Sequence, residues 1–150
     1  MPQKTLSKPE TEISAPESQD ANPRRLSGAR YNEEAKQHFI NGDLETAERL
    51  FRRAIRADAR LAEPYSNLAV LYWQRGEIGA ALYELTQALR IDPNHLDTVI
   101  NYGQICLELG RADVAQRVFG DYLQRNPDVP EIQRLLAEAS ATSHSQVATE

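Results

Sequence analysis

The middle of the chain alternates apolar and polar residues at the spacing of amphipathic helices. One helix is predicted by apolar side chains at i, i+3, i+4 and i+7, namely Tyr65, Leu68, Ala69 and Tyr72. A second helix, from about 78 to 91, is predicted by a similar stripe made of Leu82, Leu85, Ala88 and Leu89. Gly76 separates the two stripes and tolerates the positive φ at which many helices end. Pro93 follows the second stripe and cannot continue a helix, so residues 62–95 are predicted to form a helical hairpin.

This hairpin pattern occurs three times, in residues 28–61, 62–95 and 96–129. Glycine recurs at Gly42, Gly76 and Gly110, which are 34 residues apart. Three further columns hold small or bulky apolar residues: Ala35, Ala69 and Gly103; Ala47, Ala81 and Ala115; and Phe51, Leu85 and Phe119. A small side chain lets two helix axes approach closely, and a bulky one fills the core between them. Self-similarity at this period predicts a stack of helical hairpins.

These columns resemble the tetratricopeptide repeat, and the resemblance covers residues 28 to 129. It implies an all-α fold, a right-handed α-solenoid of three helix-turn-helix units. The first unit departs most from the family, with Glu34, His38 and Ala59 at positions where the family has leucine, an aromatic residue and proline. An end repeat has one face open to water, which makes such substitutions tolerable.

The flanking segments are predicted to differ from the repeats. Residues 1–27 carry Pro2, Pro9, Pro16 and Pro23 and few aliphatic residues, which predicts a disordered tail. Ser27 is expected near the entry to the first helix. Residues 130–140 begin with Pro130 and place Ile132, Leu135, Leu136 and Ala139 on one face, which predicts a capping helix. Residues 141–150 are short and polar and are expected to be a disordered tail.

Net charge and hydropathy limit the cellular compartments and the classes of partner that fit this sequence. A net charge of -5 argues against general attraction to nucleic acid or anionic lipid. No apolar run has the roughly 20 residues needed to cross a bilayer, and the acidic N-terminal segment fits neither a secretory signal nor a transit peptide. The single cysteine, Cys106, agrees with a reducing compartment. These observations predict a cytoplasmic protein without membrane insertion.

A second stripe runs along the first helix of each unit, about a third of a turn from the buried one. The resemblance implies that this stripe lines a concave groove that holds a peptide or a helix. The candidate groove residues are Asn32, Lys36, Phe39, Ile40, Ser66, Val70, Trp73, Gln74, Ile100, Gln104 and Leu107. Six of them are large and apolar, with Trp73 the best candidate for an anchor. The alternative is that neighbouring helices or a tail of the chain cover them.

Charge on the candidate groove leans acidic, with Glu63, Asp97 and Glu108 set against Lys36. An apolar partner segment with basic flanks complements such a surface. Some family members bind the carboxylate ends of heat-shock chaperones through Lys, Arg and Asn on this face. Asn67 and Asn101 match the asparagines of that clamp, whereas Asp97 stands where a basic residue is wanted.

A basic stripe lies on the predicted second helix of the first unit and consists of Arg49, Arg52, Arg53 and Arg56. It could receive an anionic partner such as a nucleic-acid phosphate. However, Glu45 and Glu48 precede Arg49 and Arg52 by four residues, the favourable order for ion pairs along a helix. This order favours a solvated, internally paired helix face.

No set of residues indicates catalysis. The three histidines, His38, His95 and His144, fall in a predicted helix, turn and tail without a second metal ligand at suitable spacing. Cys106 lies in a buried stripe, where a thiol is usually inert. No catalytic residue, metal or cofactor is therefore predicted. The leading hypothesis is a non-catalytic adaptor that binds another protein. A chaperone that holds an aggregation-prone subunit, similar to type III secretion chaperones, and a self-assembling homo-oligomeric scaffold remain as alternatives.

Overall fold

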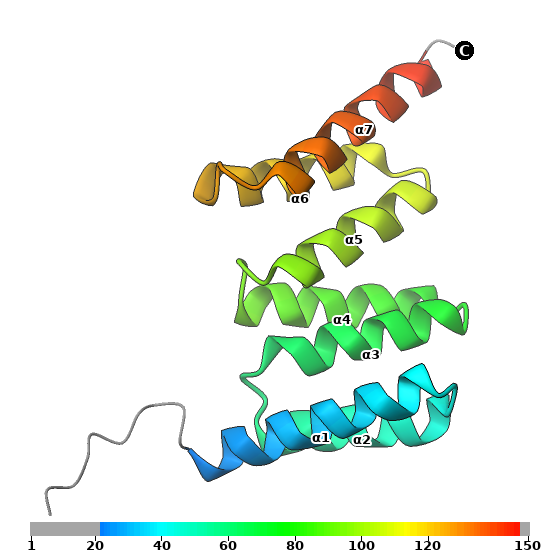
Figure 1. Cartoon of the computed structure of the whole chain (residues 1–150). Helices are drawn as coiled ribbons and strands as arrows, with labels where there is room; N and C mark the ends of the chain where they lie inside the picture. Colours follow the sequence, from blue (N-terminus) through cyan, green and yellow to red (C-terminus); the bar gives the residue numbers. More distant parts are fainter. Residues whose placement is uncertain (1–21, 148–150) are drawn as a thin grey trace, which may run out of the picture.

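The computed structural model describes residues 22–147, and this part of the chain folds into seven helices without a strand. The helices are α1 (Pro23–Ile40), α2 (Leu44–Ala57), α3 (Ala62–Gln74), α4 (Ile78–Ile91), α5 (Leu96–Glu108), α6 (Ala112–Arg125) and α7 (Pro130–Val147). They pair as hairpins α1/α2, α3/α4 and α5/α6, stacked one on the next, with α7 packed on α6 (Figure 1). The predicted all-α solenoid of three hairpins is confirmed.

The turn inside each hairpin uses the glycine that the sequence places there. Gly42, Gly76 and Gly110 have φ of 82°, 75° and 73°, the left-handed region that other residues enter only at a cost. Their N–H groups donate to the carbonyls of Phe39, Trp73 and Leu107 over 3.0, 2.9 and 3.0 Å. These carbonyls belong to the last-but-one residues of α1, α3 and α5, so each glycine turn is bonded to the backbone of a candidate groove residue.

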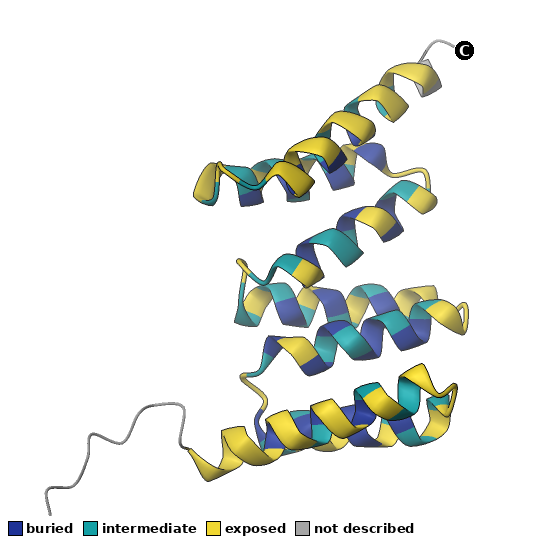
Figure 2. Cartoon of the chain, viewed as in Figure 1, coloured by how far each residue is buried: buried dark blue, intermediate teal, exposed yellow. Residues whose placement is uncertain are grey.

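The core lies between the helices of each hairpin and between neighbouring hairpins (Figure 2). Ala47, Ala81 and Ala115 are all 0% exposed, as expected for close helix crossings. The bulky column of Phe51, Leu85 and Phe119 is at most 1% exposed. The small and bulky columns are therefore both buried. A single hairpin would leave most of its side chains exposed, and stacking on its neighbours gives it a core.

A charged network joins the first unit to the second. Arg52 on α2 donates to the Tyr72 hydroxyl over 2.5 Å, and this hydroxyl donates to Glu48 over 3.2 Å. Glu48 also pairs with Arg52 at 2.7 Å and accepts a hydrogen bond from Arg75. Burial raises the pKa of Glu48, but the bond from Arg75 and the charge of Arg52 outweigh burial and lower the pKa on balance. The network thus holds an ionised carboxylate between the two hairpins.

The outer boundaries of the helices differ from those expected. The first helix begins at Pro23 rather than 28, and Asn22 caps it by accepting a hydrogen bond from the Arg24 N–H over 3.0 Å. Ser27 is therefore not at the helix entry, since it lies one turn inside α1 and bonds the Pro23 carbonyl over 2.9 Å. Asn followed by Pro is a strong helix start, because the asparagine caps and proline needs no partner for its nitrogen. Residues 1–21 of the expected tail lie outside the described part.

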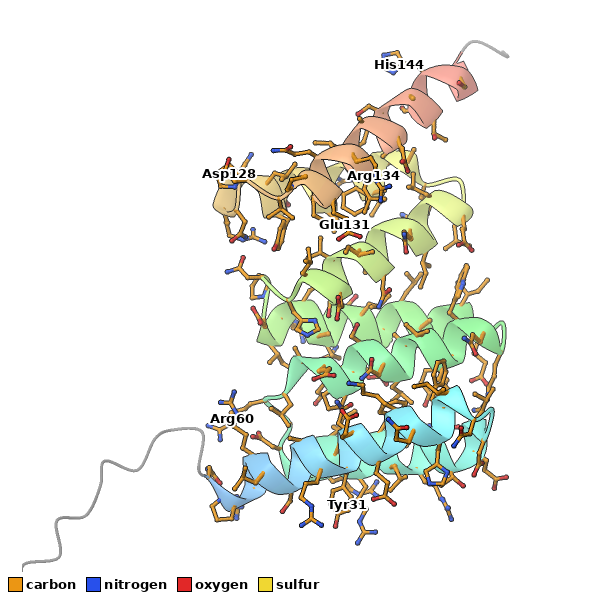
Figure 3. All side chains as sticks on the ribbon, in the orientation of Figure 1. Tyr31, Arg60, Asp128, Glu131, Arg134 and His144 are labelled. Atoms are coloured by element: carbon orange, nitrogen blue, oxygen red, sulfur yellow. The ribbon has the colours of Figure 1, made fainter. Side chains whose placement is uncertain are left out.

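The last helix continues to Val147 instead of ending near 140, so most of the expected C-terminal tail is helical. Residues 148–150 lie outside the described part. His144, expected in the tail, lies on α7 with its ring nitrogen 2.7 Å from the Ser140 carbonyl. Figure 3 shows His144 at one end of the stack and Tyr31, on α1, at the other.

Candidate partner-binding face

The first helices α1, α3 and α5 lie next to one another and share a row of side-chain hydrogen bonds. The Asn67 side-chain amide donates to Oδ1 of Asn32 over 3.1 Å, and the Asn101 side-chain amide donates to the Ser66 hydroxyl over 3.3 Å. Asn32 and Ser66 are only 4% and 1% exposed. These two predicted groove residues are therefore buried in this structure, and their side-chain oxygens accept hydrogen bonds from the adjacent first helix. The clamp-like asparagines, Asn67 and Asn101, are likewise engaged within the protein.

The remaining candidate residues form a surface that we call the first-helix face: Lys36, Phe39, Ile40, Val70, Trp73, Gln74, Ile100, Gln104 and Leu107. Ile40 is 73% exposed, and the other five apolar members are half-buried. Phe39 and Trp73 pack against the core of the first two units, while Ile100 and Leu107 pack against the core of the third. Each of these four side chains therefore fills the core with one part and reaches solvent with another.

Lys36 is the only cation of the first-helix face, and the protein itself neutralises it. Its ammonium group lies 3.0 Å from Glu33 on the same helix and 3.2 Å from Glu63 on α3. The hydrogen bonds to Glu33 and then Glu63 raise the pKa of Lys36 and keep it protonated. Both partners and Lys36 itself are more than a third exposed, so the pairs add little stability but do leave the lysine satisfied.

Free polar groups on this face are amides and carboxylates. Gln74 and Gln104 are exposed, and their side chains make no hydrogen bond within the described residues. Asp97 and Glu108 are exposed at the same face, as is Glu63 apart from its bond to Lys36. The face thus offers half-buried apolar side chains, unused amides and an excess of negative charge.

The basic stripe on α2 is partly used inside the protein. The predicted Glu48–Arg52 ion pair is present, whereas Arg49 bonds the Thr46 hydroxyl over 3.4 Å instead of pairing with Glu45. The Arg53 guanidinium lies 4.5 Å from the centre of the Tyr31 ring, a cation–π contact. The stripe is therefore largely a solvated helix face with contacts of its own.

Groups that could support chemistry are dispersed. Cys106 is 2% exposed, and burial raises the pKa of its thiol, which favours the unreactive protonated form. Within residues 22–147, no three of the His, Cys, Asp and Glu side chains gather as a metal site would require. None of the helices in this same range combines the length and the apolar character of a membrane span.

Sequence reasoning missed a hollow on the opposite side of the stack. It has a volume of about 530 Å³ and lies between α4, α5 and α6, with Leu89, Tyr102, Val114 and Val118 in its lining. In the sequence, these residues appear only as apolar positions of separate helices. The hollow depends on the distance between α4 and α6, and the apolar pattern within one helix does not predict that distance.

Comparison with known families assigns the repeats. Two tetratricopeptide-repeat family models match residues 32–95 and 74–139, which together run from the middle of α1 to the middle of α7. This chain belongs to the tetratricopeptide repeat proteins. A curated relative, the protein SGT1 homolog of Oryza sativa subsp. japonica, is 28% identical over 82 residues, which are 55% of this chain and 22% of that protein. The chain therefore spans about a fifth of this relative.

Solved structures show the same fold at low sequence identity. The first tetratricopeptide domain of human RPAP3 has a TM-score of 0.71 at 16% identity, with 84% of this chain and 99% of that domain covered. The first such domain of Spaghetti (RPAP3), bound to the HSP90 peptide SRMEEVD, has a TM-score of 0.69 at 16% identity, covering 80% and 95%. The TPR2B domain of yeast Sti1, in a pHsp70 complex, has a TM-score of 0.68 at 20% identity, covering 77% and 98%.

Proposed function

We propose that this protein is a non-catalytic adaptor that binds an apolar or amphipathic segment of another polypeptide on its first-helix face. The observation that carries the proposal is the row of half-buried apolar side chains along α1, α3 and α5. Rigid side chains that are anchored in the core and open on one side lose little entropy on binding, which is a property of interface anchors.

The polar groups of the face support a partner with basic flanks. Lys36 is neutralised by Glu33 and Glu63, while Asp97 and Glu108 have no cation paired with them among the described residues. The peptide bound by the Spaghetti domain, SRMEEVD, has three acidic residues near its end. An acidic segment would meet like charge on this face, whereas lysine or arginine beside an apolar core would be complementary. The free amides of Gln74 and Gln104 can bond the backbone of the bound segment.

Trp73 provides a direct assay because it is the only tryptophan in the chain and lies on the proposed face. The probe is an amphipathic peptide without tryptophan, with leucine at i, i+3, i+4 and i+7 and lysine at both ends. Binding should change the Trp73 emission, and replacing the terminal lysines with glutamate should weaken binding. Equal binding of both peptides would contradict the proposed charge preference.

A matched pair of variants tests where the peptide binds. Ile40→Ser changes an exposed residue of the first-helix face, and Tyr83→Ser changes a 62% exposed residue of α4 as its control. Ile40→Ser should weaken binding, by on the order of tenfold for an apolar contact worth about 1.4 kcal/mol, while Tyr83→Ser leaves it unchanged. Both side chains are mainly exposed, so the helical circular dichroism should not change. Equal effects of the two variants would reject this face as the site.

A further inference from the structure

The hollow between α4, α5 and α6 is an apolar surface on the side of the stack formed by the second helices. Leu89 comes from α4, Tyr102 from α5, and Val114 and Val118 from α6, and all four side chains are half-buried. The Tyr102 hydroxyl makes no hydrogen bond within the described residues. A volume of 530 Å³ is within the range of sites that hold a small ligand or a few side chains.

Positive charge surrounds this apolar lining. Arg90 and Arg111 are exposed, and their guanidinium groups have no ion pair or hydrogen bond among the residues that the structure describes. Arg117 is 3.5 Å from Asp113, but both side chains are more than 70% exposed, with values of 72% and 73%. Asp121 is the one acidic residue in the lining. The rim is thus basic, although the whole chain has a net charge of -5 and its first-helix face is acidic.

The repeat supplies an internal comparison, because a second hollow lies one unit earlier, between α2, α3 and α4. Its volume is 320 Å³, and its residues Ile55, Arg56 and Leu68 stand 34 positions before Leu89, Arg90 and Tyr102. Glu84 stands 34 positions before Val118, so the earlier hollow contains a carboxylate where the later one has an apolar side chain. Burial raises the pKa of Glu84, an effect that the charge of Arg52 only partly opposes.

We propose that the hollow between α4 and α6 is a second binding site, which takes a short peptide segment with a bulky apolar residue between acidic residues. The apolar side chain would contact Leu89, Tyr102, Val114 and Val118, and the carboxylates would pair with Arg90 and Arg111. Charge complementarity selects this partner over a basic or a neutral apolar segment. In the equivalent hollow, Glu84 repels the same segment.

The experiment uses the full chain and a fluorescent peptide with a central Leu-Phe pair between two Glu-Asp pairs. Arg90→Glu and Val118→Glu should each reduce its affinity by on the order of tenfold or more, because each places a carboxylate beside the acidic peptide. The matched control is Arg56→Glu, at the equivalent position of the earlier hollow, and it should have no effect. Val118→Glu reproduces the residue that the fold already carries at 84, and Arg90→Glu alters an exposed position, so both should fold.

Nuclear magnetic resonance locates the bound peptide. The methyl signals of Val114 and Val118 should shift on binding, and those of Val70, on the first-helix face, should not. Three results would each overturn the proposal. The first is a set of shifts confined to Val70, the second is equal affinity for a peptide with lysine in place of the acidic residues, and the third is no binding of the acidic peptide. A second copy of the chain is the competing occupant. Concentration-dependent dimerisation that Val118→Glu abolishes would show that the hollow binds this copy, and would also overturn the proposal.

Discussion

Gly103 tests the packing of the third hairpin because its hydrogen faces the ring of Phe119. A Cβ at position 103 would lie 2.1 Å from Cζ, 2.4 Å from Cε1 and 2.8 Å from Cε2 of that ring. Carbon atoms in contact sit about 3.5 to 4.0 Å apart, so the ring or the helix must move by roughly 1.4 Å. Phe119 is 0% exposed and has no solvent into which it can swing. Gly103→Ala therefore overfills this core.

The magnitude follows from two opposing effects. Overfilling a packed core costs about 1 to 3 kcal/mol, and exchanging glycine for alanine within a helix returns up to about 1 kcal/mol. We expect a net loss of about 1 to 2 kcal/mol, measured by urea unfolding followed by circular dichroism with an unchanged m-value. The melting temperature should fall by roughly 4 °C for each kcal/mol.

Phe119→Leu supplies the matched rescue, because the second hairpin already combines Ala69 with Leu85 in one buried cluster. Alone it should cost on the order of 1 kcal/mol through lost volume. Combined with Gly103→Ala it should cost less than the sum of the two changes, by about 1 kcal/mol. If Gly103→Ala is as stable as the natural chain, then the third hairpin relaxes to the arrangement of the first, where Ala35 and Phe51 share a core, and the packing argument is refuted.

Three further predictions concern single residues. Gly76→Ala should lower the free energy of unfolding by on the order of 1 to 2 kcal/mol because φ at this position is 75°, whereas Gly120→Ala in α6 should raise it by up to about 1 kcal/mol. Neither new Cβ meets an atom within 4 Å, so the two changes differ only in their backbone conformation. Equal urea midpoints for the two variants would contradict this explanation. The raised pKa of Glu84 means that the folded chain binds this proton more tightly than the unfolded chain, so its contribution to stability declines as pH rises above about 4.5. Glu84→Gln should therefore be more stable than the natural chain at neutral pH and no more stable well below pH 4.5, and a pH-independent difference in unfolding free energy would contradict this assignment. Cys106 should react with an aromatic disulfide reagent far more slowly in the folded chain than in urea, and equal rates would show that its thiol is accessible.

The hairpins were predictable because each key residue type occurs at the same place three times. Positive φ at Gly42, Gly76 and Gly110 and full burial of the alanine column follow from local rules that hold in every unit. The ends were less predictable. Asn22 followed by Pro23 is a helix start that the proline-rich composition around it obscured, and α7 meets no glycine or proline that would stop it at 140.

The candidate face was predictable only in outline. Helical period indicates the direction of a side chain around its own helix, but the rotation of one hairpin against the next decides what covers it. Asn32 and Ser66 lie at the boundary between the face and the adjacent first helix, and they are buried there. The hollow lined by Leu89 and Val118 depends in the same way on the separation of two helices, which a pattern within either helix does not record.

The two junctions between neighbouring units contain side chains of different chemistry. Glu48, Arg52, Tyr72 and Arg75 connect the first and second units, but the residues 34 positions later are Leu82, Thr86, Cys106 and Leu109, none of which is charged at neutral pH. Because the pKa of Glu48 is lowered in the folded chain, protonating this carboxylate in acid removes its ion pairs and weakens the contact that it makes between the first two hairpins. The four residues at the equivalent places of the second junction contain no carboxylate that could have this effect.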